Sequence, residues 1–463
     1  MEIIMTAFEY EGIYKIGGLG DYTTGLTKAL SEIDDINLKV IMPKFKQITG
    51  KFEFITSCHI GDDSTSFPSE CLDFDVYHTK INNTDVYLIE NDHYFSHDFI
   101  YDYENINLRY GFYCRAIKEF IEKMNWKPDI IHSNDSSQGF LPMIYKKNCP
   151  SETLPKFVLT IHSIYFSANY KLKDEERDLM NYYLGFEWEG NSVWFLKEAI
   201  VWSDKLITVG KSNGEEIQTP EKGYGLDKYI LENNGVTGLL NGIDYDTYPR
   251  IEDFDEFLAN KQSSKLKLQK KFNLEENTDI PLLMYCGRLG GEQKGCTLLL
   301  DKMEDLMENG CQFILLGDGV TDIDKFEECS NKYDNFIACI RHDEELAKEL
   351  YEASDILLMP SKCEPNGLSQ IIAMHYGTVP VVHNTGGLKD TIIDCLEYED
   401  DGNGFKFYNF GSDEFLDAVL NAKKIFENDN EKWVKTIENC YNEDYSWKKM
   451  SKPYVEIYES LMR

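Results

Sequence analysis

Short apolar runs alternate along this chain with longer segments whose apolar residues recur at helical spacing. The runs predict buried strands and the longer segments predict amphipathic helices. The predicted strands are Ile3–Phe8, Leu38–Met42, Val86–Ile89, Asp129–His132, Phe157–Ile161, Lys205–Val209, Leu282–Cys286, Phe313–Leu316, Ile356–Met359 and Val379–Val382. The predicted helices include Tyr22–Leu30, Arg109–Met124, Glu344–Ala353 and Leu368–Tyr376. This alternation is typical of parallel sheets with right-handed crossovers.

A change of composition divides the chain near its middle. The sequence turns acidic and polar around residues 245–266, and a new series of strands and helices begins at Leu282. A chain of 463 residues also exceeds the size of one ordinary core. We therefore predict an α/β protein with two Rossmann-like domains, residues 1–245 and 246–445, followed by an amphipathic helix within residues 446–463.

Composition and charge narrow the classes of partner. Hydrophobic residues make up 42 % of the chain and aromatic residues 13 %, which is enough for well-filled cores. The 81 acidic and 47 basic residues give a net charge of -34, which repels the phosphates of nucleic acids and of anionic membranes. No apolar run approaches the ~20 residues that span a bilayer. We therefore expect no nucleic-acid partner and no membrane partner.

The cysteines and the N-terminus bear on the compartment. The 12 cysteines are scattered, without a CxxC pair or a His/Cys cluster at zinc spacing, so we expect reduced thiols. The N-terminal residues MEIIMT lack a basic stretch followed by a long apolar core, so we expect no signal peptide. The expected location is the cytoplasm, or the plastid stroma if the source is a eukaryote.

Two similar glycine loops open predicted helices. Residues 15–21 read KIGGLGD and residues 386–390 read GGLKD. Paired glycines at a helix start let backbone N–H groups approach an anion, and Lys15 adds a full positive charge to the first loop. The same turns can also be packing devices. Their similarity suggests two similar sheets that present these loops across a cleft.

Two cations follow the predicted strand Leu282–Cys286. Arg288 and Lys294 lie in a glycine-rich loop, either as a diphosphate site or as two surface cations. A diphosphate site in so acidic a chain needs local positive charge of this kind, because salt screens charges beyond ~8 Å.

Three further candidates lie at predicted strand ends. Glu364 can bind sugar hydroxyls, and the N–H groups of Gly367 and Leu368 can face a phosphate. The alternative is an acidic turn with a helix cap. His162 and Asp135 each close a predicted strand and so point to the ligand side of the sheet, although a lone histidine is more often structural.

Several mechanisms find no support in the motifs. The chain has no GxxxxGK[ST] P-loop, no GxSxG elbow and no HExxH pair. A glycosidase pair of carboxylates stays open, but it requires neither the cations nor the glycine loops.

Taken in order, these segments resemble the motifs of the bacterial glycogen synthase and plant starch synthase family. The stretch 15–21 resembles that family's KxGGLGD, and EIQTPEKGYGL at 216–226 resembles its EIQTPExGxGL. The remaining matches are GLLNGID at 238–244, RLGGEQKG at 288–295, EPNGLSQ at 364–370, YGTVP at 376–380 and TGGL at 385–388. The match covers nearly the whole chain.

The resemblance implies a GT-B fold, in which two domains face each other across a deep cleft and a C-terminal helix crosses back to the first domain. It implies a retaining glucosyltransferase that moves glucose from ADP-glucose to an α-1,4-glucan, such as glycogen or a maltooligosaccharide. It implies no metal and no cofactor other than the nucleotide-sugar donor.

The resemblance also implies residue roles. Arg288 and Lys294 would hold the diphosphate, and Glu364 would bind the glucose hydroxyls. The carbonyl of His162 would face the developing oxocarbenium, and Asp135 would orient the acceptor. The implied donor-binding residues are Lys15, Gly17, Gly18, Asn241, Gly367, Leu368, Thr385, Gly386, Gly387 and His342, and the implied acceptor-binding residues are Asp21 and Asp135.

Some positions depart from the family motifs. Ser136 and Ser137 stand where the family carries an aromatic residue and a histidine beside the acceptor. Asn366 replaces the cysteine of EPCGL, and Ser163 replaces the asparagine of TIHN. His342 stands where the family often carries a tyrosine against the base, so UDP-glucose stays an alternative donor. A weakly active glucan-binding or regulatory homologue is the alternative from another class.

Overall fold

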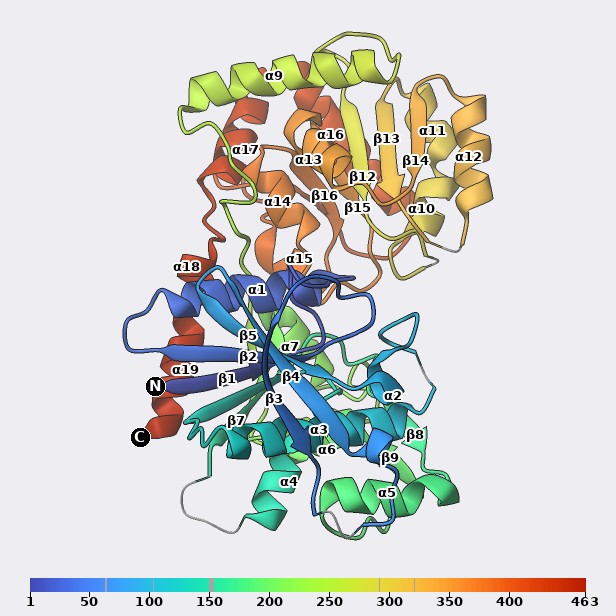
Figure 1. Cartoon of the computed structure of the whole chain (residues 1–463). Helices are drawn as coiled ribbons and strands as arrows, with labels where there is room; N and C mark the ends of the chain where they lie inside the picture. The colour runs from blue at the N-terminus through green and yellow to red at the C-terminus, as the bar shows by residue number, and fades with distance from the viewer. Residues whose placement is uncertain (63–64, 103, 150–153, 291, 320) are drawn as a thin grey trace. The chain divides into compact units, whose positions relative to one another are not determined.

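The computed structural model describes residues 1–62, 65–102, 104–149, 154–290, 292–319 and 321–463, and these form two compact α/β units (Figure 1). Unit 1 comprises Met1–Gly242 together with Trp447–Arg463, and unit 2 comprises Ile243–Ser446. The chain therefore leaves unit 1 after Gly242 and returns to it at Trp447.

Unit 1 is built on a nine-stranded sheet with the order β11-β10-β7-β6-β1-β2-β5-β4-β3. Its strands are β1 (Glu2–Thr6), β2 (Asn37–Pro43), β3 (Glu53–His59), β4 (Asp73–Ile81), β5 (Thr84–Glu90), β6 (Ile130–Asn134), β7 (Lys156–Ile161), β10 (Lys205–Val209) and β11 (Thr237–Leu239). Two short strands, β8 (Asn169–Lys171) and β9 (Ser192–Trp194), pair separately. Every strand predicted for this half of the chain is present.

The predicted parallel pairing holds for most of this sheet, but one edge of unit 1 is antiparallel. Strand β4 runs antiparallel to both β3 and β5. The turn between β4 and β5 consists of Asn82 and Asn83, whose φ angles are 47° and 64°. A two-residue turn with positive φ at both positions makes a tight hairpin, whereas parallel neighbours need a long crossover.

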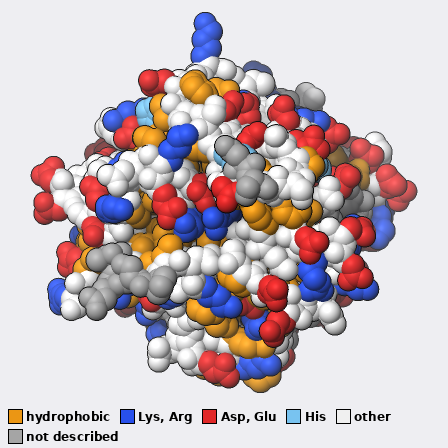
Figure 2. All heavy atoms as spheres, turned by 60° about the horizontal axis from the view of Figure 1, so that its bottom comes forward, with side chains coloured by type: hydrophobic (Ala, Val, Ile, Leu, Met, Phe, Trp, Pro, Cys, Tyr) orange, Lys and Arg blue, Asp and Glu red, His pale blue; other side chains and the backbone are white. Residues whose placement is uncertain are grey.

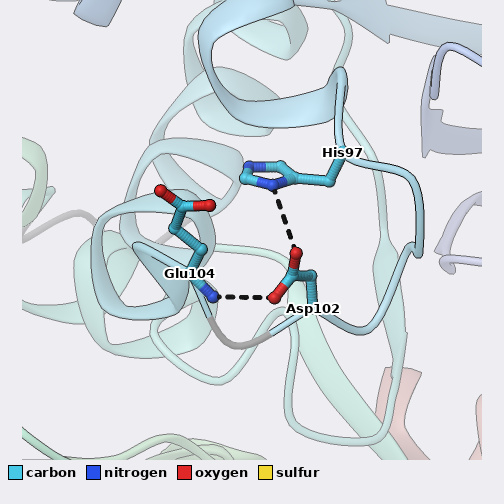
Figure 3. A group of neighbouring side chains, drawn as sticks. All are labelled: His97, Asp102 and Glu104. Atoms are coloured by element: carbon cyan, nitrogen blue, oxygen red, sulfur yellow. Dashed lines mark hydrogen bonds and ion pairs between the residues drawn. The ribbon is translucent and has the colours of Figure 1, made fainter.

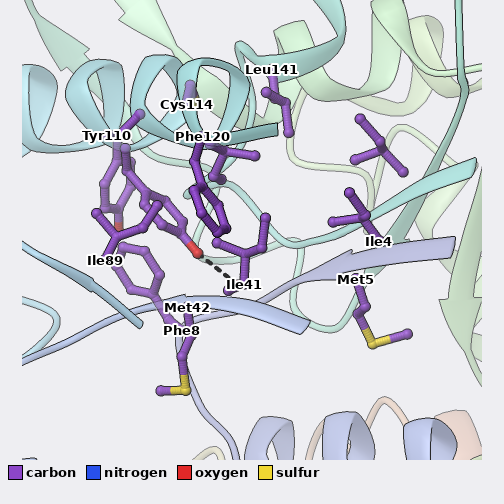
Figure 4. Packing of buried hydrophobic residues seen from close by; sticks show 14 of the residues in the cluster. Ile4, Met5, Phe8, Ile41, Met42, Ile89, Tyr110, Cys114, Phe120 and Leu141 are labelled. Carbon is purple, nitrogen blue, oxygen red and sulfur yellow. Dashed lines mark hydrogen bonds between the residues drawn. The ribbon is translucent and has the colours of Figure 1, made fainter. Parts of the chain in front are cut away.

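Helices pack on this sheet and close the core of unit 1. They are α1 (Gly18–Ser31), α2 (Asp92–Phe95), α3 (Ile106–Lys123), α4 (Leu141–Asn148), α5 (Asp174–Leu184), α6 (Phe195–Trp202), α7 (Lys211–Ile217), α8 (Asp227–Glu232), α18 (Trp447–Met450) and α19 (Lys452–Met462), with a 3₁₀ turn at Ser69–Cys71. Figure 4 shows side chains of α3 meeting those of β1, β2 and β5. The buried Tyr113 hydroxyl donates to the Ile41 carbonyl over 2.9 Å, which ties α3 to β2.

The C-terminal segment forms two helices instead of the single predicted helix. Pro453 lies in the first turn of α19, where its ring lacks the N–H that would continue α18. The segment is anchored in unit 1, because Tyr458 Oη lies 2.6 Å from His132 Nδ1. His132 Nε2 lies 2.7 Å from Thr160 Oγ1, and burial lowers the pKa of His132 to about 3. The neutral imidazole thus joins α19 to β6 and β7.

Unit 2 contains one parallel sheet with the order β14-β13-β12-β15-β16-β17. The strands are β12 (Leu282–Cys286), β13 (Gln312–Gly317), β14 (Phe336–Ile340), β15 (Ile356–Met359), β16 (Val379–His383) and β17 (Phe405–Phe407). The helices are α9 (Phe254–Lys271), α10 (Cys296–Asp301), α11 (Met303–Glu308), α12 (Ile323–Lys332), α13 (Glu344–Ala353), α14 (Ser369–His375), α15 (Gly386–Thr391), α16 (Ser412–Asn428) and α17 (Asn430–Asn442). The edge strands β14 and β17 were not predicted, because β14 mixes buried and partly buried residues and β17 has only three residues.

The surface and the thiols complete the description. Figure 2 shows one face of the molecule, where acidic side chains are spread among lysines and arginines and do not gather in one patch. Each of the twelve cysteines is a free thiol. Within the described ranges, no helix has the length and apolar character needed to cross a bilayer.

Candidate active site

The carboxyl ends of β6 and β7 bring two predicted residues of unit 1 together. Asp135 follows β6 and His162 follows β7, and these strands are neighbours in the sheet. Asp135 Oδ1 accepts the backbone N–H of His162 over 2.7 Å and that of Ser163 over 3.3 Å. The carboxylate of Asp135 therefore fixes the main chain at His162.

The His162 side chain is held as firmly as its backbone. Its Nε2 lies 2.9 Å from Asn134 Oδ1, and its ring packs edge-on against Tyr22 with centroids 4.4 Å apart. Burial lowers the pKa of His162 to about 3, so the imidazole is neutral at physiological pH. This side chain is consequently poor as a general acid, and its fixed position instead orients the adjoining main chain.

Asp135 has an unusual backbone and an unusual titration. Its φ is 55°, a left-handed conformation that aspartate and asparagine tolerate better than most residues. Burial raises the pKa of its carboxyl from 3.8 to about 7, although the two N–H donors oppose the shift. The folded protein thus binds a proton at Asp135 between about pH 4 and pH 7 that the unfolded chain releases.

Asp135→Asn should make thermal stability less dependent on pH. The free energy of unfolding of the wild type falls as pH rises between 3.8 and about 7, because the folded state then binds more protons at this site. Asparagine fits the same φ and cannot ionise. We expect similar melting temperatures at pH 5 and a variant that is more stable by ~2–4 °C at pH 8, the shift typical of about 1 kcal/mol. Parallel melting curves from pH 5 to pH 8 would contradict the assignment.

The lysine of the first glycine loop is neutralised by its own surroundings. Lys15 Nζ lies 2.9 Å from Asp21 Oδ1 and 3.2 Å from Glu11 Oε1. Burial lowers the pKa of Lys15, but these two acids more than offset that effect and the net pKa is raised. In this conformation the ammonium group of Lys15 is ion-paired. The carboxylate oxygens of Asp21 and Glu11 can accept hydrogen bonds from hydroxyl groups of a ligand.

Glu9 organises the same loop, and the sequence pattern did not predict this role. Only 3 % of Glu9 is exposed. Its Oε2 accepts the backbone N–H groups of Ile16 and Gly17 over 2.7 and 2.8 Å, and its Oε1 accepts a short hydrogen bond from the Tyr101 hydroxyl. The N–H of Gly17 is therefore already engaged. The signal in the sequence was an acidic residue placed just after β1 in an apolar stretch.

The start of α1 leaves other donors open. Gly17 caps this helix with extended backbone and without a side-chain hydrogen bond. No described residue accepts a hydrogen bond from the N–H of Gly18 or Leu19. The helix start therefore offers these two donors, with the partial positive charge of a 14-residue helix behind them.

The departure at Ser136 and Ser137 lies inside the fold. Both residues are buried, and Ser137 Oγ accepts a hydrogen bond from Gln138 Nε2 over 2.7 Å. These two serines are therefore part of the interior of unit 1.

Unit 2 brings Glu364 and Lys294 into direct contact. Lys294 lies in the loop between β12 and α10, and Glu364 follows β15. Lys294 Nζ is 2.6 Å from Glu364 Oε2, which also accepts the Ser361 hydroxyl over 3.1 Å. Arg288 is exposed and donates to Gln293 Oε1 over 3.0 Å. The site thus combines a buried carboxylate, a partly exposed ammonium and an exposed guanidinium.

Glycines allow the loops around Glu364 to touch. A Cβ on Gly386, whose φ is 45°, would lie 2.1 Å from the Glu364 carbonyl oxygen, and one on Gly387 would lie 2.1 Å from that of Asn366. The N–H of Gly387 donates to the Glu364 carbonyl over 3.0 Å and is thus engaged. Thr385 Oγ1 is buried and has no hydrogen-bond partner among the described residues. The threonine hydroxyl therefore keeps its hydrogen-bonding capacity within the described part of the chain.

The other predicted donor residues lie at strand ends or helix starts. His342 follows β14 with 75 % of its side chain exposed, and its Nε2 is 3.7 Å from Glu344. Gly367 has a φ of 72° and Leu368 caps α14. Asn241 is buried in unit 1 beyond β11. Gly291 of the RLGGEQKG loop lies outside the described residues.

One acidic cluster has metal-ligand chemistry. His97, Asp102 and Glu104 place their ligand atoms within 4.8 Å of one another (Figure 3). Asp102 accepts the Glu104 backbone N–H over 3.1 Å and lies 3.6 Å from His97 Nδ1. These contacts describe a hydrogen-bonded turn, and we assign it no ion.

Comparisons with known proteins identify the family of the chain. Residues 2–232 match the starch synthase catalytic domain family, and residues 280–423 match the glycosyl transferases group 1 family. The chain is 35 % identical to a glycogen synthase of Clostridium kluyveri and 33 % identical to one of Lactococcus lactis, with 100 % of each chain covered. A solved structure of the catalytic domain of starch synthase IV from Arabidopsis thaliana, bound to ADP and acarbose, matches with a TM-score of 0.87 and 27 % identity over 100 % of this chain and 99 % of that one.

Proposed function

Since this chain belongs to the glycogen synthase and starch synthase family of glycosyltransferases, we propose that it transfers glucose from ADP-glucose to the non-reducing end of an α-1,4-glucan with retention of configuration. The proposal concerns the donor, the acceptor and the stereochemistry. Membership of the family supplies the general activity, which is glycosyl transfer.

The observation that carries the proposal is the grouping of Arg288, Lys294 and Glu364 at the carboxyl ends of β12 and β15. When the bond between glucose and the diphosphate breaks, negative charge develops on the leaving nucleoside diphosphate. Two positioned cations stabilise that charge, and a good leaving group needs no strong protein acid. Glu364 can accept hydrogen bonds from the glucose hydroxyls. We propose that Lys294 moves from Glu364 to the diphosphate when the donor binds.

Each unit also offers hydrogen-bond donors of its own to an anionic ligand. In unit 2, the hydroxyl of Thr385 would donate to a phosphate oxygen of the donor. In unit 1, the N–H groups of Gly18 and Leu19 would donate to an anion. The N–H groups of Gly17 and Gly387 are hydrogen-bonded within the protein, so the proposal assigns anion binding to these other donors. The proposed reaction uses no metal ion, because the cations and N–H donors carry the charge stabilisation.

For the acceptor, the proposal assigns the groups at the strand ends of unit 1. Asp135 fixes the main chain at His162, whose carbonyl would face the developing oxocarbenium. The carboxylates of Asp21 and Glu11, which are partly exposed beside Lys15, would accept hydrogen bonds from hydroxyls of the glucan.

The choice of ADP-glucose is supported by the ADP bound in the starch synthase IV structure. UDP-glucose is the alternative, because His342 does not by itself select a base. A catalytically weak glucan-binding homologue is the alternative of another class.

Incubation with glycogen and labelled donors tests these alternatives. The purified protein is given ADP-glucose or UDP-glucose with a chelator present, and incorporation of label into the glucan is measured. We expect faster extension with ADP-glucose and release of the label by an enzyme specific for α-1,4 bonds. Faster extension with UDP-glucose would refute the assignment of ADP-glucose as the donor and leave the rest of the proposal intact. No extension with either donor would support the inactive homologue.

A further inference from the structure

Three aromatic side chains of unit 1 lie exposed on two neighbouring loops, and we call them the aromatic platform. Tyr165, Phe166 and Tyr224 are 43 %, 64 % and 50 % exposed. The rings of Tyr165 and Tyr224 are 4.5 Å apart and inclined by 52°. Two loops that are far apart in the sequence therefore bring Tyr165 and Tyr224 together, and the exposed Phe166 directly follows Tyr165.

The backbone at Tyr224 indicates that this exposure is maintained at a cost. Its φ is 51°, a left-handed conformation that costs a bulky residue about 1–2 kcal/mol. The neighbouring Gly225 has a φ of 80°, and a Cβ on Gly223 would lie 2.5 Å from the Cβ of Asp227. The turn is therefore tightly built, and it holds an aromatic ring in solvent where glycine would be less strained.

The platform lies close to the proposed acceptor groups. Tyr165 follows His162 by three residues, and a turn bond from Phe166 N–H to the Ser163 carbonyl, 3.3 Å long, links the two. Asp135 holds the backbone of both His162 and Ser163. The platform is thus connected to a segment that the protein fixes in place.

The size of the platform favours a small ligand over a protein. With a full aromatic side chain burying about 200 Å², the three exposed fractions amount to roughly 300 Å². A stable protein interface needs about 800 Å² on each partner. Nucleic acids also stack on aromatic rings, but a net charge of -34 repels their phosphates. A neutral glucan has apolar ring faces and carries no such penalty.

We propose that the aromatic platform binds glucose units of the acceptor chain, behind the unit that reacts at His162. The inference rests on the proposed function, because it takes the glucan as the acceptor. Stacking of glucose rings on Tyr165, Phe166 and Tyr224 supplies affinity along the chain and leaves the chemistry to other groups. The glucan is thereby bound at a second position, close to its reacting end.

Binding of maltoheptaose without donor tests the platform directly. Tyr224→Gly removes the ring at a backbone conformation that glycine adopts readily, and Phe166→Ala removes the most exposed ring. Phe54→Ala is the matched control, because Phe54 is 53 % exposed on β3 of the same unit. We expect the Kd measured by calorimetry to rise about tenfold for each platform variant, which corresponds to ~1.4 kcal/mol. The control should bind as the wild type does.

Kinetics separate this inference from the proposed function. With glycogen as acceptor, the platform variants should raise the KM for glucan severalfold and leave the kcat and the KM for donor nearly unchanged. Platform variants that bind maltoheptaose as tightly as the wild type would overturn the inference. A wild type that binds maltoheptaose but transfers no glucose would overturn the proposed function and leave the platform supported by its binding data.

Discussion

Glu364→Ala is expected to lower kcat by a factor of about 10²–10³, the range found when one positioned group is removed from a polar active site. The carboxylate is buried, and among the described residues it accepts side-chain hydrogen bonds from Lys294 and Ser361. Its removal would abolish the proposed contact with the glucose hydroxyls and release Lys294 from the position it holds. Turnover is measured with saturating donor and glycogen.

The stability of this variant distinguishes catalysis from folding. Lys294 is partly exposed, so losing its partner should cost only about 1 kcal/mol of unfolding free energy. Glu292→Gln is the matched control, because Glu292 and Lys362 form an exposed 2.7 Å ion pair between the same two loops. We expect the control to keep full turnover. If Glu364→Ala lost its cooperative thermal transition, Glu364 would be a structural residue.

Glu9→Ala is expected to lower kcat/KM for the donor by about 10², or ~2.7 kcal/mol. The substitution leaves the N–H groups of Ile16 and Gly17 without their acceptor and frees the Tyr101 hydroxyl. The loop that presents the N–H groups of Gly18 and Leu19 should then lose its fixed conformation. Glu9→Gln retains one oxygen that can accept both N–H groups, so it should recover most of the loss.

A second buried glutamate of unit 1 provides the control. Glu176 accepts hydrogen bonds from Asn107 Nδ2 over 3.2 Å and from the Lys173 N–H over 3.1 Å. Glu176→Gln should reduce stability to a similar degree as Glu9→Gln and leave kcat/KM unchanged. Hydrogen exchange of the 9–22 peptide gives a readout that does not depend on activity. Faster exchange in Glu9→Ala with unaltered kcat/KM would show that the loop does not position the donor.

The family was recognisable from the chain because its motifs are long and ordered. The resemblance drawn from residues 15–21 to 385–388 is confirmed by full-length relatives at 33–35 % identity, and the two-domain α/β fold of the GT-B class is confirmed with it. Strands β10, β12 and β15 and helix α13 have the predicted bounds. In each case an apolar run or helical stripe is bounded by polar residues, so local pattern and burial agree.

The sequence could not predict which N–H groups, hydroxyls and charged side chains of the site are free to bind a ligand and which are already hydrogen-bonded within the protein. Gly17 and Gly387 were expected to bind the donor, yet Glu9 and the Glu364 carbonyl already take their N–H groups. The sequence pattern also did not predict the antiparallel hairpin β4–β5 or the interruption of the C-terminal helix before α19. A hydrogen bond that spans many residues leaves no periodic signal, because it depends on where the sheet brings two distant loops.

Periodicity and ordered motifs are local properties of the chain. They were therefore enough to predict most strands and helices and to identify the family. The state of each site group depended on contacts of long sequence separation. Examples are Lys294 against Glu364 across 70 residues, and Asp135 against the His162 backbone across 27. Only the folded chain brings such atoms within 3 Å, where burial and charge set which groups are paired and which are open to a substrate.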